Sequence, residues 1–439
     1  MITFLILAAI VLGLLAVTRL SRVYELTAEL RGQREEEISD RESKMNSRLL
    51  WAFPFAYFGF FLWLTVHYHH AMLPVSASEH GVWLDDLLNF NWVILVVVFF
   101  ITNILLFYFA GKYYHRSDRR AYYYPHNNKW ELGWTIVPAV VMISIIIYGL
   151  RVWDRITSHA PPGTPEVELY AQQFKWMTRY PGPDGRLGAT DFRLINATNE
   201  MGIVTPASIS TRLTELAEET ATVKKRLATE GDHLPADKVV ELEDRIKHLE
   251  RMSGKIINLR TLMDRDIAEK KAKGERSQYE FGADDLVLKE FHLPVGQDVL
   301  LVIRSQDVIH SAYIPHLRTQ MNAVPGMTTV FHMTPTITTE DMRARPEVIN
   351  QVKDINTERT ARGEEPYEFD FVLLCNKICG ASHYNMQMPL VVEPTGDYAA
   401  WLARQKGFET AEPAKAEAPV EATTTTVSVA AATNVPNTH

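Results

Sequence analysis

Cysteine is scarce in this 439-residue chain, which contains only Cys375 and Cys379. Two cysteines cannot form a disulfide framework, and their close spacing favours metal or redox chemistry. The chain also lacks a C-x-x-C-H sequence, so it has no haem-attachment motif of its own. Its formal net charge is -8. The sequence has neither a basic face nor a base-stacking motif, so there is no reason to expect nucleic acid as a partner.

The residues around the two cysteines form a candidate metal-binding motif. The stretch CNKICGASHYNM continues from Cys379 to His383 and then Met386. Thiolate, imidazole and thioether groups suit copper better than magnesium, calcium or manganese. A second histidine would complete such a site, and His310 in the segment DVIHS is the candidate. The alternatives are a reactive thiol pair, or a zinc site formed by two cysteines and two histidines.

Long apolar runs are confined to the first 153 residues. The segments 49–66, 92–110 and 134–153 are each long enough to cross a membrane, and the run 2–17 is near the lower limit. No basic residue precedes the run 2–17 and no small-residue cleavage pattern follows it, so we expect an uncleaved anchor, with a cleaved signal peptide as the alternative. The sequence therefore predicts about four transmembrane helices.

The distribution of basic residues predicts how these helices are oriented. Residues 18–48 contain seven Lys or Arg and residues 112–132 contain five, whereas residues 71–91 contain none. The positive-inside rule places the two basic loops in the cytoplasm. Everything after Trp153 is therefore expected outside the cytoplasm.

Short strand-like runs separated by turn sequences follow the apolar region. They predict a sandwich or small barrel, not a parallel sheet covered by helices. The expected strands are VELYAQQFKWMTRY, FRLIN, LVLKEFHLPV, DVLLVIRS, TTVFHM and DFVLL. Heptad-like spacing at 208–273 predicts an inserted antiparallel helical hairpin that packs on itself or on a partner. Residues 340–366 form a second, polar insertion, and residues 408–439 lack periodicity, which predicts a disordered tail.

One loop with two cysteines, a histidine and a methionine, joined by a remote histidine, is typical of a cupredoxin-like β-sandwich. The motif closely resembles subunit II of the haem-copper cytochrome c oxidases, whose cysteine loop reads approximately C-x-E-x-C-G-x-x-H-x-x-M. The segments HNNKWELGWTIVP, QQFKW and DVIHS are similar to other parts of that family. The likeness covers about residues 91–205 and 285–400. It divides the chain into extra N-terminal spans with a cytoplasmic linker at 1–70, a two-helix membrane anchor at 91–153 and a cupredoxin-like domain at 160–400.

The resemblance implies a dinuclear copper centre of the CuA type. Its ligands would be Cys375 and Cys379 as bridges, His310 and His383 as caps, Met386 as a weak axial ligand and the backbone carbonyl of Lys377. The family has a glutamate in place of Lys377, and that carboxylate helps to hold magnesium. Asn322 also stands where the family often has an aspartate, so we do not predict a magnesium site.

The resemblance also implies a role in respiration. The chain would pass electrons from cytochrome c, free or bound in a complex, to haem in subunit I, where oxygen is reduced. It would have no catalytic residue for oxygen itself, and haem would be present only in partner subunits. Phe174 and Trp176 would lie where electrons enter, with Phe174 in place of a family tryptophan. Glu131 would lie near the mouth of a proton path into subunit I, although an acid in a first helical turn also complements the helix dipole.

Two other functions are compatible with the sequence, namely copper delivery or storage and a scaffold for assembling a larger complex. The extra spans and the long insertions favour a bacterial inner membrane protein with its copper domain on the periplasmic side. Subunit I and other oxidase subunits would then be its partners.

Overall fold

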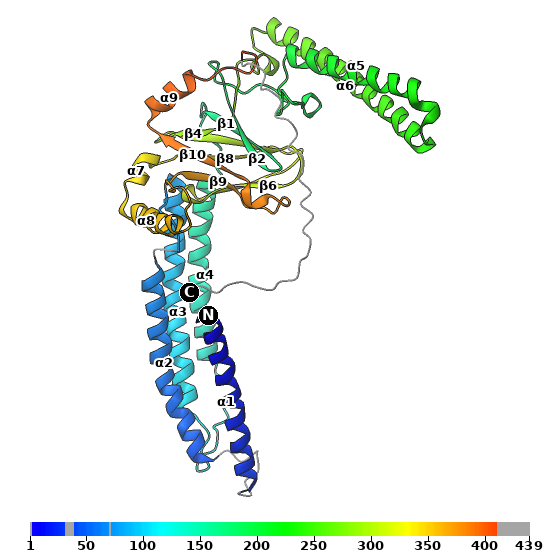
Figure 1. The fold of residues 1–439 in the computed structure, drawn as a ribbon. Helices are drawn as coiled ribbons and strands as arrows, with labels where there is room; N and C mark the ends of the chain where they lie inside the picture. Colours follow the sequence, from blue (N-terminus) through cyan, green and yellow to red (C-terminus); the bar gives the residue numbers. More distant parts are fainter. Residues whose placement is uncertain (1, 31–38, 70–71, 411–439) are drawn as a thin grey trace. The chain divides into compact units, whose positions relative to one another are not determined.

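The computed structural model describes residues 2–30, 39–69 and 72–410, and the chain divides into two compact units. One unit contains residues up to Met72 together with Trp92–Pro138. The other contains Leu73–Asn91 and the described residues from Ala139 onward. The N-terminal helices are α1 (Ile2–Leu30), α2 (Asp40–Tyr68), α3 (Glu79–Lys112) and α4 (Asn128–Thr157) (Figure 1). Almost all of the expected tail lies outside the described residues.

Helices α2, α3 and α4 are long and apolar enough to cross a membrane. Ser39 begins α2 with a capping box, in which its side chain and that of Glu42 each accept a backbone N–H of the other residue. Helix α3 begins well before the expected apolar segment, because the Ser78 hydroxyl accepts the N–H of Gly81. The chain is thus membrane-anchored, while the span expected at residues 2–17 falls within α1 and stays a prediction.

Aromatic side chains join helices α2 and α3. The ring centroids of Phe61 and Phe99 are 4.8 Å apart, and those of Phe53 and Phe107 are 5.3 Å apart. The Ser47 hydroxyl donates a hydrogen bond to the carbonyl of Gly111 at 2.6 Å. Lipid is as apolar as these side chains, so the pair is held by close packing and by interhelical hydrogen bonding.

Two five-stranded sheets form the soluble domain, with strand orders β3-β2-β1-β5-β8 and β4-β10-β9-β6-β7. The strands are β1 (Glu166–Gln172), β2 (Lys175–Tyr180), β3 (Leu286–Leu288), β4 (Phe291–Pro294), β5 (Val299–Ser305), β6 (His310–Ile314), β7 (Thr319–Ala323), β8 (Thr329–Met333), β9 (Phe371–Cys375) and β10 (Gln387–Glu393). Alternate residues of β5 are buried, as in a strand with one face against a core. Side chains of both sheets, such as Leu301 and Leu373, share one apolar core. The cupredoxin-like sandwich is confirmed.

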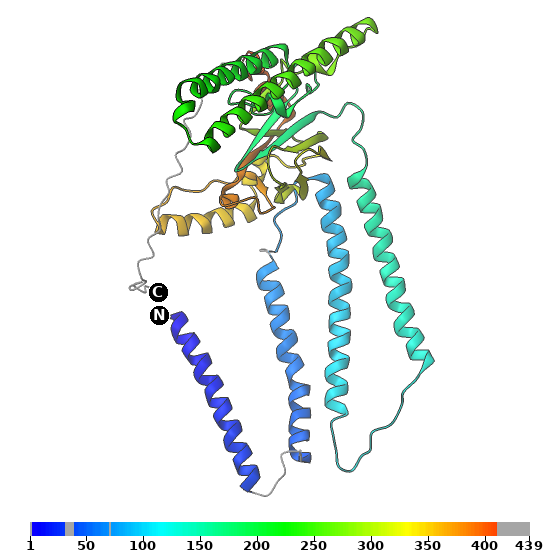
Figure 2. The ribbon, with the colours of Figure 1, turned by 90° about the vertical axis from the view of Figure 1, so that its right-hand side faces the viewer.

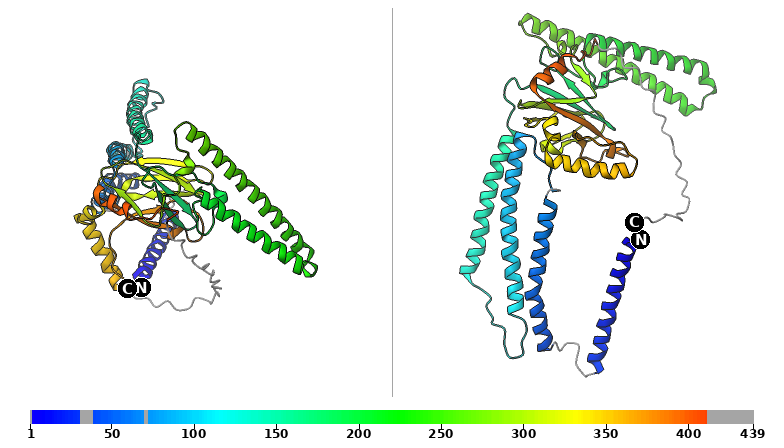
Figure 3. Two further views of the ribbon diagram at one scale, coloured as in Figure 1. Left: turned by 90° about the horizontal axis from the view of Figure 1, so that it is seen from above. Right: turned by 60° about the vertical axis from the view of Figure 1, so that its left-hand side comes forward.

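The inserted hairpin consists of α5 (Pro206–Glu230) and α6 (Ala236–Ala272), which run side by side away from the sheets (Figures 2 and 3). Thr205 caps α5, and Pro206 occupies the first helical position, where its missing N–H has no cost. The buried side chains of Leu216 and Leu249 belong to one apolar cluster between the two helices. The heptad-like seam therefore packs on itself along the hairpin. The remaining helices are α7 (Thr339–Arg343) and α8 (Pro346–Ala361), both within the polar insertion, and α9 (Thr395–Ala403).

One expected strand is wrong. The run FRLIN contains a short 3-10 turn, Phe192–Leu194, and not a strand. The side chain of Asp191 accepts the N–H of Arg193 at 2.9 Å, which offers the backbone a local alternative to sheet pairing. Leu194 is fully buried in the apolar cluster of the hairpin, so tertiary packing outweighs the strand propensity of these residues.

The stability of the soluble domain should fall in acid because of His316. Its imidazole lies edge-on to Phe369 and Phe371, and burial lowers its pKa from 6.5 to about 4. Between pH 6.5 and 4, His316 is protonated in the unfolded chain but stays neutral in the folded chain. The contribution of neutral His316 to stability is therefore complete above pH 6.5 and is lost as pH falls toward 4. The loss should be about 2–3 kcal/mol. Acid unfolding of His316→Leu should have a flatter pH dependence than that of the parent chain.

The matched control is His233→Leu, because His233 is exposed at the end of the hairpin. Its acid unfolding profile should follow that of the parent. An unchanged slope in His316→Leu would show that His316 is not the titrating group.

Candidate metal centre

Sheet register brings His310 to the cysteine loop. Strand β6 begins at His310, strand β9 ends at Cys375, and Ala312 pairs directly with Cys375. Residues two apart on a strand share a face, so the side chains of His310 and Cys375 lie on the same side of the sheet. The Nδ1 atom of His310 is 3.8 Å from the Sγ atom of Cys375.

The loop between β9 and β10 supplies the other expected ligands. The two Sγ atoms of Cys375 and Cys379 are 3.9 Å apart. The Sγ atom of Cys379 is 3.5 Å from Nδ1 of His383 and 3.8 Å from Sδ of Met386. The Sγ atom of Cys375 is 3.2 Å from the carbonyl oxygen of Lys377. The structure thus gathers all six predicted ligands around two neighbouring sulfur atoms.

The chemistry of this donor set fits a pair of soft metal ions. Both cysteines are buried free thiols. Burial, together with the neighbouring Cys375, raises the pKa of Cys379 to about 11, so a metal ion must displace a proton when it binds the thiolate. The donor atoms of His310, Cys375 and Cys379 all lie within 4.8 Å of one another, which suits a shared site. Sulfur and imidazole donors favour copper or zinc, and the thioether of Met386 favours copper.

Asp307 orients His310, and we did not identify it from the sequence. Its Oδ1 atom lies 2.8 Å from Nε2 of His310, and its Oδ2 atom accepts the N–H of Gln173 at 2.8 Å. Burial opposes ionisation, but the Gln173 N–H and the His310 ring together lower the pKa of Asp307 below its usual range. Metal-binding histidines usually donate their other N–H to a carboxylate. The signal was available in DVIHS, where an aspartate precedes the histidine by three residues.

The turn between β1 and β2 covers the cysteine loop. The side-chain amide of Gln173 donates to the carbonyl of Cys379. A Cβ atom at Gly380 would lie 2.8 Å from the Phe174 ring, and the φ of Gly380 is +145°, a conformation that side chains rarely allow. Glycine at this position therefore leaves room for Phe174 against the loop.

The other predicted residues lie in contrasting surroundings. Trp176 is buried, with its ring centroid 6.3 Å from that of His310. Glu131 lies in the first turn of α4, where its carboxylate accepts the N–H of Asn127 at 3.2 Å, so helix capping alone accounts for its position. The side chain of Lys377 is exposed, so only its carbonyl belongs to the centre.

Comparisons with known proteins identify relatives. Residues 66–152 match the family model described as cytochrome c oxidase subunit II, transmembrane domain. The chain is 27% identical over 286 residues to the alternative cytochrome c oxidase subunit 2 of Bradyrhizobium diazoefficiens, a match that spans 65% of this chain and 66% of that protein. It is 22% identical over 282 residues to cytochrome c oxidase subunit 2 of Cereibacter sphaeroides, spanning 64% of this chain and 62% of that protein.

A similar solved structure is the periplasmic domain of subunit II of cytochrome oxidase (CoxB) from Bradyrhizobium japonicum. It is 13% identical, and the match covers 56% of this chain and 95% of that domain with a TM-score of 0.24. The sandwich is defined by the two sheets of this chain. The match to the family model and the similarity to curated subunits show that this chain is similar to cytochrome c oxidase subunit II.

Proposed function

We propose that the chain is the electron-entry subunit of a respiratory terminal oxidase. In this role it accepts electrons from a cytochrome c, free or bound in a complex, and passes them to haem in subunit I, where oxygen is reduced. The observation that carries the proposal is the gathering of two imidazoles, a thioether and a carbonyl around the neighbouring sulfur atoms of two cysteines. A site for simple metal storage does not need two sulfur atoms held side by side as shared ligands.

Cys375 and Cys379 would bridge two copper ions, with His310 and His383 as caps and Met386 and the carbonyl of Lys377 as weaker ligands. When bound, the copper pair supplies a site that holds one transferable electron shared by both ions. The protein keeps this site rigid, because Cys375 donates its backbone N–H to the carbonyl of Met386 at 3.0 Å and so closes the base of the loop. Rigid ligands favour fast transfer, since little rearrangement accompanies each electron.

Asp307 fixes the proton on His310. In the tautomer that carries its proton on Nε2, His310 donates to Asp307 and leaves Nδ1, which lies near Cys375, free to bind a metal ion. Because His310 is fully buried, water does not compete for this nitrogen. The imidazole is therefore ready to bind a metal ion without first losing a proton from Nδ1.

The proposal also assigns a location and partners. The copper domain would lie on the periplasmic side of a bacterial inner membrane, as the basic loops predict. Subunit I and other oxidase subunits would pack on the membrane helices, and Glu131 would lie near the mouth of a proton path. The proposal includes no magnesium ion, since Lys377 replaces the family's glutamate.

Electrons should enter near Phe174, which lies against Gly380 beside Cys379. Phe174→Ala should slow reduction by the cytochrome c donor about tenfold, the effect of removing an aromatic contact worth 1–2 kcal/mol at a docking surface. Stopped-flow mixing with reduced cytochrome c would measure this rate. The copper absorption spectrum should stay unchanged, because Phe174 is not a ligand.

The control for Phe174 is Phe192→Ala, which removes an exposed phenylalanine outside the cysteine loop. It should leave the reduction rate unchanged. Equal rates for Phe174→Ala and the parent chain would place electron entry elsewhere.

Gentle detergent purification of a tagged chain tests the proposed function. A multi-span partner with haem absorbance should co-purify, and the preparation should consume oxygen when reduced cytochrome c is supplied. Recovery of the copper-loaded chain alone, with no haem, would favour copper delivery or storage instead.

A further inference from the structure

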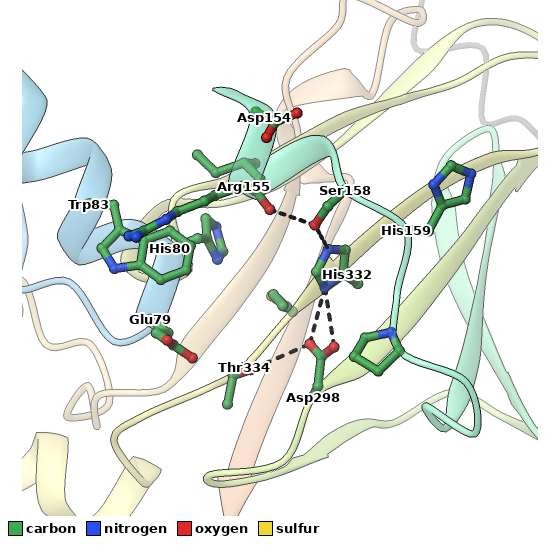
Figure 4. Close-up of a pocket in the computed structure, with 13 residues that line it drawn as sticks. Glu79, His80, Trp83, Asp154, Arg155, Ser158, His159, Asp298, His332 and Thr334 are labelled. Carbon is green, nitrogen blue, oxygen red and sulfur yellow. Dashed lines mark hydrogen bonds and ion pairs between the residues drawn. The ribbon is translucent and has the colours of Figure 1, made fainter. Parts of the chain in front are cut away.

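A second candidate site lies outside the cysteine loop. It is a cavity of about 540 Å³ where the first turns of α3, the end of α4 and strand β8 meet (Figure 4). All three segments belong to the same compact unit. Its lining includes three histidines and three carboxylates, together with Arg155, Ser158 and Thr334; these histidines and carboxylates are His80, His159, His332, Glu79, Asp154 and Asp298.

His80 is the feature that needs an explanation. Its side chain is only 5% exposed, and neither ring nitrogen makes a well-formed hydrogen bond to a described residue, although the backbone of Arg318 lies near the ring. Its ring packs edge-on against Phe331, with centroids 5.1 Å apart, which fixes the ring beside the cavity. A buried imidazole without a partner costs free energy unless something else satisfies it. A ligand in the cavity would supply a stronger partner for this ring.

His332 is prepared in the way that metal-binding histidines usually are. Its Nδ1 atom lies 3.2 Å from the carboxylate of Asp298. Its Nε2 atom faces the cavity, where its neighbour is the hydroxyl of Ser158 at 3.5 Å (Figure 4). A carboxylate on one ring nitrogen sets the tautomer and leaves the other nitrogen available as a ligand.

The negative charge around the imidazoles of His80 and His332 favours binding of a cation. Three carboxylates, those of Glu79, Asp154 and Asp298, line the same cavity. Arg155 is the one arginine in the lining, and its guanidinium lies over the ring of Trp83, 5.1 Å from the centroid. Carboxylates would repel an anionic headgroup or a phosphate, whereas imidazole and carboxylate are common ligands of zinc.

We propose that this cavity binds a zinc-like divalent ion through the imidazoles of His80 and His332, with the lining carboxylates balancing its charge. The ion would join segments that are far apart in the sequence, since His80 lies in the first turn of α3 and His332 lies on β8. Direct bonds already hold these segments together, because Arg318 pairs with Asp85 at 2.9 Å and the N–H of Glu79 donates to the carbonyl of Thr334 at 3.0 Å. An ion here would stabilise the packing of the first turns of α3 on strand β8.

The test uses the full chain in detergent with its copper centre loaded, so that the cysteine loop cannot take up zinc. Equilibrium dialysis against zinc should give one zinc ion per chain. X-ray absorption at the zinc edge should show only nitrogen and oxygen ligands, at about 2.0–2.1 Å. His332→Gln and His80→Gln should each weaken zinc binding at least tenfold, and Asp298→Asn should weaken it about 10–100-fold through the orientation of His332.

His316→Gln is the matched control, because His316 is also a largely buried histidine with a buried, unpartnered Nδ1 but lies outside the cavity. It should bind zinc as the parent does. If the buried variant His80→Gln does not fold, His332→Gln and Asp298→Asn still decide the matter. The proposal is overturned if the copper-loaded chain takes up no zinc, if sulfur appears among the zinc ligands, or if the variants bind zinc as the parent does.

Discussion

Cys379→Ser should remove the copper centre and stop electron delivery. The Sγ atom of Cys379 is close to three other expected ligand atoms, those of Cys375, His383 and Met386. A serine hydroxyl is a hard donor that does not replace a bridging thiolate. Loss of a residue that only orients a metal ligand lowers metal affinity or activity about 10–100-fold. Loss of the Cys379 thiolate itself should therefore lower cytochrome c-driven oxygen uptake by more than about 100-fold. Copper content and oxygen uptake should be measured on the same preparation.

Lys377→Ala is the matched control in the same loop. It removes an exposed side chain and keeps the backbone carbonyl that lies 3.2 Å from Cys375. Copper content and oxygen uptake should stay near those of the parent. Persistence of oxygen uptake in Cys379→Ser after copper is lost would contradict an electron-entry role and favour an assembly scaffold.

Arg179→Ala should destabilise the soluble domain by about 3 kcal/mol, because it leaves the buried Asp285 without a cation and Glu168 with Arg304 alone. The guanidinium of Arg179 is 2.5 Å from Glu168 and 2.9 Å from Asp285, and all three side chains are 4% exposed or less. Burial raises the pKa of Asp285 to about 6. Burial also opposes ionisation of Glu168, but Arg179 and Arg304 outweigh it and lower the pKa of Glu168.

This network also supports the candidate metal centre. Glu168 and Arg179 are paired across β1 and β2, the two strands whose connecting turn carries Gln173 and Phe174 over the cysteine loop. Arg179→Ala should therefore lower the thermal midpoint of the sandwich and also loosen copper binding.

The control for Arg179 is an exposed ion pair on the hairpin. Lys224 and Glu250 are 2.8 Å apart and each is 54% exposed, so Lys224→Ala should cost less than about 1 kcal/mol. Thermal unfolding followed by tryptophan fluorescence would compare the variants. A shift in Arg179→Ala no larger than that in Lys224→Ala would show that the buried network does not stabilise the domain.

The clustering of the candidate ligands was predictable, because most of them lie close together in the sequence. Four of the side-chain ligands fall within twelve residues, and the remaining one, His310, stands in a recognisable segment. The hairpin was predictable for a similar reason, since an apolar seam with heptad-like spacing needs only local information. Its helices lie within two residues of the expected outer boundaries, at Pro206 and Ala272.

Contacts made by tertiary structure were not predictable. The hydrogen bond that the Gln173 N–H donates to Asp307 joins residues 134 positions apart, and only the fold brings them together. His80 and His332 line one cavity for the same reason. The strand expected at FRLIN failed because Asp191 and the hairpin core determine the conformation of Phe192–Leu194. Sequence patterns predict elements and clustered ligands well, whereas supporting residues depend on the register of the sheets.

Electron paramagnetic resonance of the purified, copper-loaded chain tests the central claim most directly. A bridged copper pair should hold two copper ions and give the hyperfine pattern of one electron shared equally by two copper nuclei. The parent chain and Lys377→Ala should show this pattern, and Cys379→Ser should not. The pattern of a single copper nucleus, or a chain that retains zinc and no copper at the cysteine loop, would contradict the account.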